Sequence, residues 1–294
     1  MRLLVFGKGG QVSKALMAVT QAEGIAARFL GQDEADLTDP ETCARRIAEA
    51  DVTAVINAAA YTAVDAAETD REVAHLVNAA APGAMARAAA AKGVPFVHIS
   101  TDYVFDGAGT RAWTEDDPTG PLGYYGQSKL DGEREVLAAG GQGVILRTAW
   151  VYDGEAKNFV TAMLGLAAGR DVLKVVDDQR GSPTPARAVA EACLAVARAF
   201  EEGRGTAGLF HFAGQPPVAR NAFAEAILAA TPNPPRIEPV SSDAFPTPAE
   251  RPANSVLDCT RIGAVYGIAQ PDWRPDVAAI AAAYSPKTAP EDKA

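Results

Sequence analysis

The sequence predicts an α/β protein, with a doubly wound parallel sheet of the Rossmann type followed by a smaller C-terminal α/β substrate-capping region. Three observations predict this fold. Short apolar strands alternate with helices over residues 1–152, a glycine-rich turn joins the first strand to the first helix, and prolines and loops become frequent after residue 152. We therefore assign 1–152 to a dinucleotide-binding domain and 153–294 mainly to a substrate-binding region, some of whose segments return to the first domain.

The composition is that of a globular protein without polyanionic or membrane partners. The chain has 294 residues, of which 48% are apolar, and a formal net charge of −10. That charge argues against non-specific binding to nucleic acid or membrane surfaces. No apolar run approaches the roughly 20 residues that span a bilayer. The three cysteines form no metal or redox pattern, and no leader is recognisable, so we expect a cytoplasmic location.

The chain opens with an apolar strand, a glycine-rich turn and a helix. We expect the strand over Arg2–Phe6 and the helix from Ser13 to about Glu23, with Gly7 and Gly10 in the turn. Glycines let the backbone approach a pyrophosphate, and a helix N-terminus supplies free N–H groups and a favourable dipole. The spacing favours dinucleotide binding over an ordinary strand-to-helix turn, with Ser13 standing where a third glycine is common.

The second strand, expected over Ala26–Leu30, lacks the terminal acidic residue that often holds the ribose of NAD. Gly31 and Gln32 follow it, and the nearest acid, Asp33, comes slightly late. The missing acid removes one barrier to the 2′-phosphate of NADPH, but no well-placed arginine selects that phosphate. The cofactor is therefore expected to be NADPH or NADH.

The loop after this strand has two expected roles. Asp39 should cap the next helix, with Pro40 at its first position. Asp36 and Leu37 lie where the loop could contact adenine. Capping is the role expected for Asp39 itself.

Two further strands end in residues suited to a ligand crevice. We expect them over Val52–Ile56 and Phe96–Ile99, with an alanine-rich helix over Glu72–Lys92 between them. Open parallel sheets bind ligands at the carboxyl ends of their strands. The small residues 57–60 leave room for a ligand and Thr101 presents a hydroxyl group. The alternatives are that the small residues serve only tight packing, and that the Thr101 hydroxyl is hydrogen-bonded within the protein.

A tyrosine and a lysine four residues apart begin the next predicted helix. Tyr125 and Lys129 would lie one above the other on a helix face. A cation held near a phenol lowers the phenol pKa and makes it a better proton donor to a developing alkoxide. The alternative is that Tyr125 and Lys129 are two exposed helix residues without a chemical role. The glycine-rich turn and the upstream segment HISTDYVFDG at 98–107 favour the chemical interpretation.

The part of the chain after residue 152 should line a substrate cleft. Helices are expected over 158–169, 184–201 and 219–230, and the polar, turn-rich segment 177–184 suits a cleft wall. Trp150, at the exit of a strand over Val144–Leu146, either offers a flat face to a sugar or base or packs in the core. The histidines show no metal-ligand spacing, and His98 is expected in the core, so no metal site is predicted.

Motifs from one end of the chain to the other resemble a known family. They are FGKGGQV at 6–12, NAAAYTAVDAAE at 57–68, STDYVFDG at 100–107, YGQSK at 125–129, LRTAWVY at 146–152, DDQRGSPT at 177–184 and FPTPAERPANSVLD at 245–258. Together they are similar to the extended short-chain dehydrogenase/reductases and, more narrowly, to the dTDP-4-dehydrorhamnose reductase family. The chain departs from the familiar pattern at Ser13 and Tyr61. Ala15 stands where some relatives place an acid that holds interface magnesium.

The resemblance implies reduction of the 4-keto group of dTDP-4-dehydro-β-L-rhamnose by NADPH or NADH. The product would be dTDP-β-L-rhamnose, used for cell-surface polysaccharide. By position, the implied catalytic residues are Thr101, Tyr125 and Lys129. The implied cofactor contacts are Gly7, Gly10, Gln11, Val12, Asp36, Leu37, Ala58, Ala59, Tyr61, Tyr125 and Lys129. The implied substrate contacts are Thr101, Asp102, Tyr125, Trp150, Asn158 and Arg251.

Two other functions stay open at the level of sequence. One is a related reductase that acts on a different keto-sugar nucleotide. The other is a non-catalytic, dinucleotide-binding regulatory subunit, against which the intact Thr–Tyr–Lys set argues. The expected partner is a small nucleotide-sugar substrate, and the chain is expected to be a monomer or a homodimer.

Overall fold

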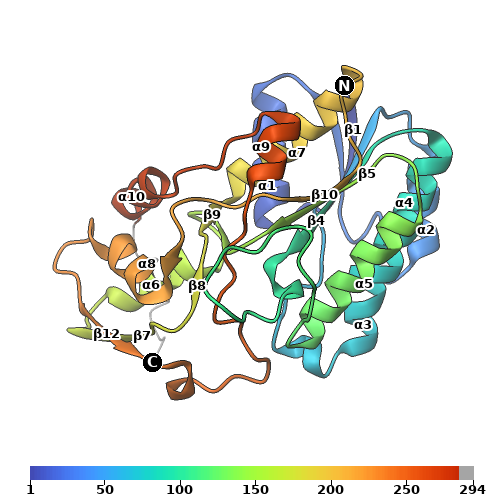
Figure 1. The fold of residues 1–294 in the computed structure, drawn as a ribbon. Coiled ribbons are helices and arrows are strands. Elements are labelled where there is room, and N and C mark those ends of the chain that lie inside the picture. The colour runs from blue at the N-terminus through green and yellow to red at the C-terminus, as the bar shows by residue number, and fades with distance from the viewer. Residues whose placement is uncertain (285–294) are drawn as a thin grey trace, which may run out of the picture.

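A six-stranded parallel sheet forms the centre of the protein (Figure 1). The structure is a computed structural model and describes residues 1–284, so the last ten residues of the predicted substrate-binding region lie outside it. The strand order is β10-β5-β4-β3-β1-β2, which confirms the doubly wound α/β fold. The strands are β1 (Arg2–Phe6), β2 (Ala26–Leu30), β3 (Ala54–Asn57), β4 (Phe96–Thr101), β5 (Gly143–Thr148) and β10 (Gly208–His211).

Helices cover both faces of this sheet, and each face has its own hydrophobic core. The first core includes Leu3 and Val5, whereas the second includes Leu4 and Phe6, because alternate residues of a strand point to opposite faces. The helices over the first core are α1 (Gln11–Ala22), α7 (Ala186–Glu201) and α9 (Thr260–Tyr266). Those over the second core are α2 (Pro40–Glu49), α4 (Ala81–Lys92) and α5 (Tyr124–Ala138).

The alanine-rich helix contains a π turn that contacts the candidate site. Arg71–His75 (α3) is α-helical, Leu76–Ala80 forms the π turn, and α4 follows without a break. In the π turn, Asn78 bonds both backbone groups of Tyr61 and donates to Ser128 Oγ at 3.0 Å. Helix α5 approaches so closely that a Cβ on Gly132 would lie 2.0 Å from Asn78 O. The π turn therefore joins the loop after β3 to the helix of the tyrosine.

A third core lies outside the central sheet, at the left of Figure 1. Phe223 stacks against Phe159 and meets Trp273 edge-on, which joins three helices. These helices are α6 (Phe159–Ala167), α8 (Arg220–Leu228) and α10 (Arg274–Ala283). The small strand pairs of this region are β7 (Val172–Val176) with β12 (Arg236–Val240), β8 (Arg180–Gly181) with β11 (Val218–Ala219), and β6 (Val151–Tyr152) with β9 (Thr184–Pro185).

Several boundaries differ from those expected, for identifiable reasons. Helix α1 begins at Gln11 instead of the expected Ser13, with Gly10 as its N-cap. Residues 184–185 form a strand, and α7 begins only after Pro185. The expected cap on α2 is present, with Thr42 N donating to Asp39 Oδ1 at 3.0 Å. Short 3₁₀ turns cover Ala66–Glu68, Asp102–Val104 and Ser242–Ala244. Within residues 1–284, no helix has the length and apolar character needed to cross a membrane.

Candidate active site and cofactor site

A cavity of about 600 Å³ lies beside the glycine-rich turn, at the carboxyl ends of β1, β2 and β3. Its wall is formed by the turn after β1, the loop after β2 and the loop after β3. Among its lining residues are five of the predicted cofactor contacts, namely Gly7, Asp36, Leu37, Ala59 and Tyr61. The cavity therefore lies where an open parallel sheet binds a dinucleotide.

The glycine-rich turn fits a bound pyrophosphate. Gly7 has φ +112°, a left-handed conformation, and a Cβ on it would lie 2.6 Å from Ser13 Oγ. The same Cβ would lie 3.2 Å from the backbone of Ala58, whereas nothing lies within 4 Å of the Cβ position of Gly9. Ser13 is thus accommodated because Gly7 has no side chain. Together, the open space at Gly9 and the N-terminus of α1 suit a phosphate.

Both an acid and a base lie at the end of β2. A Cβ on Gly31 would lie 2.6 Å from Asp33 Oδ1 and 3.5 Å from Lys8 Cδ. Lys8 also forms a 3.7 Å ion pair with Glu34, whose carboxylate accepts the Gly31 N–H at 3.3 Å. That backbone hydrogen bond is the main cause of the lowered pKa of Glu34. Sequence reasoning missed Lys8, although it stands inside the glycine-rich motif.

The predicted tyrosine and threonine lie together at the carboxyl end of β4. Desolvation raises the pKa of Tyr125 well above its usual value, and a hydrogen bond between the phenol and Thr101 opposes the shift. The ring of Tyr103 packs edge-on against Tyr125, with centroids 5.6 Å apart. The phenol is therefore fully protonated at neutral pH, which suits a proton donor.

Lys129, expected to lower the pKa of Tyr125, is bonded to groups of β4. Its Nζ donates to Ile99 O at 2.7 Å and lies 3.2 Å from His98 Nε2. Burial lowers the pKa of Lys129 to about 8, with Glu133 opposing the shift. Its role toward the Tyr125 phenol therefore stays a prediction.

Asp102 is a buried carboxyl group with spare hydrogen-bonding capacity. Burial raises its pKa to about 6, against the hydrogen bond from Thr101. Thr101 Oγ1 lies 3.0 Å from Asp102 Oδ1, whereas Oδ2 is buried without a hydrogen-bond partner in the described part of the chain. A free acceptor of this kind is costly unless a ligand donates to it, which is consistent with the predicted substrate contact.

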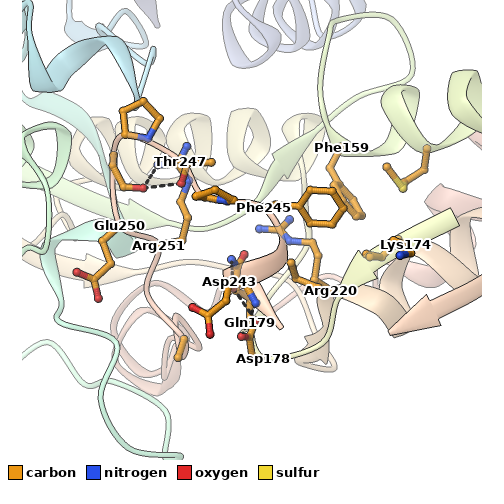
Figure 2. Close-up of a pocket in the computed structure, with 18 residues that line it drawn as sticks. Phe159, Lys174, Asp178, Gln179, Arg220, Asp243, Phe245, Thr247, Glu250 and Arg251 are labelled. Atoms are coloured by element: carbon orange, nitrogen blue, oxygen red, sulfur yellow. Dashed lines mark hydrogen bonds between the residues drawn. The ribbon is translucent and has the colours of Figure 1, made fainter. Parts of the chain in front are cut away.

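A larger cavity of about 860 Å³ lies among α6, β7 and the proline-rich segment 245–253 (Figure 2). Arg251, a predicted substrate contact, lines it and is paired with Asp65 at 2.9 Å. Arg220 lines it as well, with its guanidinium carbon 3.5 Å from the ring centre of Trp150. Burial lowers the pKa of Arg220 to about 10, which leaves it charged. Sequence reasoning missed Arg220, because nothing local distinguishes an arginine at a helix start.

Two other predicted contacts have structural partners. Asn158 caps α6 by accepting from Thr161 N at 3.1 Å, and its amide donates to Gln11 Oε1 at 2.9 Å. Trp150 has φ +46°, and its ring lies so near Gly181 that a Cβ there would be 2.3 Å from it. Asn158 and Gln11, predicted to contact substrate and cofactor, thus bond each other between the two halves of the chain. Among residues 1–284, no group of three His, Cys, Asp or Glu side chains is arranged to hold a metal ion.

Comparison with known proteins identifies the family. The family model of the RmlD substrate binding domain matches residues 1–285. The dTDP-4-dehydrorhamnose reductase of Burkholderia thailandensis is 44% identical over 286 residues, covering 93% of this chain and 96% of the relative. The crystal structure of the Clostridium acetobutylicum reductase has a TM-score of 0.89 and 32% identity, covering 95% and 98% of the two chains. That of the Bacillus anthracis reductase, in complex with NADP, has a TM-score of 0.88 and 28% identity, with the same coverage. The chain therefore belongs to the RmlD family of dTDP-4-dehydrorhamnose reductases, within the extended short-chain dehydrogenase/reductases.

Proposed function

We infer that this protein reduces the 4-keto group of dTDP-4-dehydrorhamnose with NAD(P)H, the final step of dTDP-L-rhamnose biosynthesis. The observation that carries this inference is the pairing of buried Thr101 with half-buried Tyr125, beside the orphan acceptor of Asp102. A protonated phenol, a hydroxyl partner and a carboxylate for a sugar hydroxyl are the groups that carbonyl reduction on a sugar requires.

In the proposed mechanism, bound NAD(P)H supplies the hydride to the carbonyl carbon. As negative charge develops on the carbonyl oxygen, Tyr125 Oη gives it a proton. The Thr101 hydroxyl would stabilise the phenolate left behind by turning its proton from Asp102 to the phenol oxygen. Burial keeps the phenol protonated until that moment, so the donor is ready at any pH near neutrality. Lys129 is the residue proposed to complete the set at the cofactor ribose.

The larger cavity is proposed to hold the nucleotide part of the substrate. Arg220 and Arg251 place two guanidinium groups on its wall, and such groups bind diphosphate through paired charge-assisted hydrogen bonds. Phe159 and Phe245 also line it and give apolar surface for a base (Figure 2). One face of Trp150 is covered by Arg220, so the remaining contact of Trp150 with a sugar would be through its other face.

The direct test follows the oxidation of NADPH and NADH by absorbance, with the keto-sugar nucleotide supplied by the upstream epimerase. Turnover that is lost in Tyr125→Phe, with the fold intact, supports both the reaction and the acid. No turnover of this substrate, but turnover of another keto-sugar nucleotide, would identify the related reductase. A folded, cofactor-binding protein that turns over no keto-sugar would instead support the regulatory subunit.

A further inference from the structure

A line of buried polar side chains runs from the loop after β3 to Lys129. Ala59 N donates to Asn57 Oδ1 at 3.1 Å, and Asn57 Nδ2 lies 3.1 Å from His98 Nδ1. On the other side of the same ring, His98 Nε2 lies 3.2 Å from Lys129 Nζ. Asn57, His98 and Lys129 are 1%, 0% and 2% exposed, so water does not interrupt the line.

The hydrogen bonds along this line decide where the imidazole proton lies. An amide oxygen only accepts and an amide nitrogen only donates. Because Ala59 N–H occupies Asn57 Oδ1, the Asn57 Nδ2 group faces His98 and donates to Nδ1. Burial lowers the pKa of His98 well below its usual value, so the ring is neutral and has one proton. That proton is therefore on Nε2, which faces Lys129.

An ammonium group only donates hydrogen bonds, so it has no favourable contact with a ring N–H. A neutral amine can accept from His98 Nε2–H and still donate to Ile99 O at 2.7 Å. We propose that Asn57 and His98 are positioning residues that present a ring N–H to Lys129 and thereby favour its neutral amine over its ammonium form in the cofactor-free protein. The lysine then changes charge within the working pH range, instead of being a permanent cation.

The other charged groups near Lys129 do not reverse this conclusion. Glu133, from the same helix, favours the ammonium form. Its carboxylate is already paired with Arg147 of β5 at 2.6 Å and accepts from Ser100 of β4 at 2.5 Å. Tyr125, one turn before Lys129, is neutral because burial raises its pKa. The amine therefore faces the carboxylate of Glu133, whose charge is balanced by Arg147, and the ring N–H of His98.

The test measures the titration of Lys129 itself in cofactor-free protein, and so does not depend on the proposed reaction. Lysine side chains are labelled with ¹³C at Cε, and the NMR signal that disappears in Lys129→Met is followed against pH. The wild-type signal is expected to titrate near pH 8 instead of the usual 10.5. A wild-type titration at the usual value would overturn the proposal.

Two substitutions of Asn57 separate the effect of the His98 tautomer from the effect of an added negative charge. Asn57→Asp keeps the shape and the acceptor for Ala59 N–H but moves the ring proton to Nδ1, so that Nε2 accepts from Lys129. We expect the Lys129 pKa to rise by about 1 to 2 units. Asn57→Ala also frees the ring to change tautomer, adds no charge, and should give a smaller rise. Unchanged Lys129 titration in both variants would refute the proposal.

A matched control uses the second buried histidine of the sheet. His211 lies on β10, is 0% exposed and bonds Trp113 O through Nδ1 at 3.1 Å. His211→Gln is expected to cost stability while leaving the Lys129 titration unchanged. In a pH profile of kcat/KM, the inflection assigned to Lys129 should move in the Asn57 variants and not in this control. A shift in the control as large as in Asn57→Asp would mean that the Lys129 titration reports general loosening of the sheet.

Discussion

Arg220 offers the sharpest test of the nucleotide-binding cavity. Its guanidinium lies 3.5 Å from the ring centre of Trp150 and 4.8 Å from that of Phe159, which fixes its plane. Within residues 1–284 no carboxylate forms an ion pair with it, so its donors are available to a ligand. Hydrogen bonds to a charged partner are worth about 1.5–3 kcal/mol, and each 1.36 kcal/mol is tenfold. Arg220→Met should therefore lower kcat/KM by about 10- to 150-fold.

The effect should fall mainly on KM, because the diphosphate is remote from the reacting carbon and is bound equally in ground and transition states. Arg236→Met is the matched control. Arg236 is an exposed arginine of β12 that pairs with Glu238 at 3.3 Å, and exposed pairs contribute little. The assay is steady-state oxidation of NADPH, with thermal unfolding of each variant measured beside it. A folded Arg220→Met protein with KM and kcat/KM within twofold of wild type would refute the assignment of this cavity.

The remaining predictions concern four other positions. Tyr125→Phe should lower kcat by about 10²- to 10⁴-fold with cofactor affinity retained, measured by turnover and cofactor titration, and near-normal turnover would remove the tyrosine from the mechanism. Lys8→Met should raise the KM for NADPH by about tenfold and leave that for NADH unchanged, and equal effects on both would show that Lys8 does not read the 2′-phosphate. Because Asp102 has a raised pKa in the folded protein, it contributes stability at low pH that is lost as the pH rises through about 6. In urea unfolding, Asp102→Asn should abolish that loss, and parallel stability–pH curves for the two proteins would contradict it. Gly132→Ala should destabilise the fold by about 2 kcal/mol or more in the same assay, since its Cβ would lie 2.0 Å from Asn78 O. An unchanged urea midpoint would show that the π turn moves to make room for the methyl group.

The order of the elements and the chemistry of the motifs were predictable from local patterns. Apolar runs and turn residues predicted strands β1 and β2 to the residue, because each strand is a short, mainly apolar run with a glycine after it. The expectation that Tyr125 and Lys129 share one face of α5 needs only the helical repeat. The predicted α/β fold, the family and the reductase activity are confirmed. The roles of the individual site residues stay predictions.

The tertiary structure alone decided which side chains meet across long stretches of the chain. Lys8 reaches the end of β2, Gln11 bonds Asn158, and Arg220 lies on Trp150. The protonation of Lys129 depends on His98 and Asn57 beneath it, and no local rule relates those three positions. Periodicity reports which face a residue occupies within its own element, whereas hydrogen bonds and burial depend on which elements pack against that face. The sequence by itself therefore determined the sheet and its reactive groups, and packing decided their partners, their charge and their availability to a ligand.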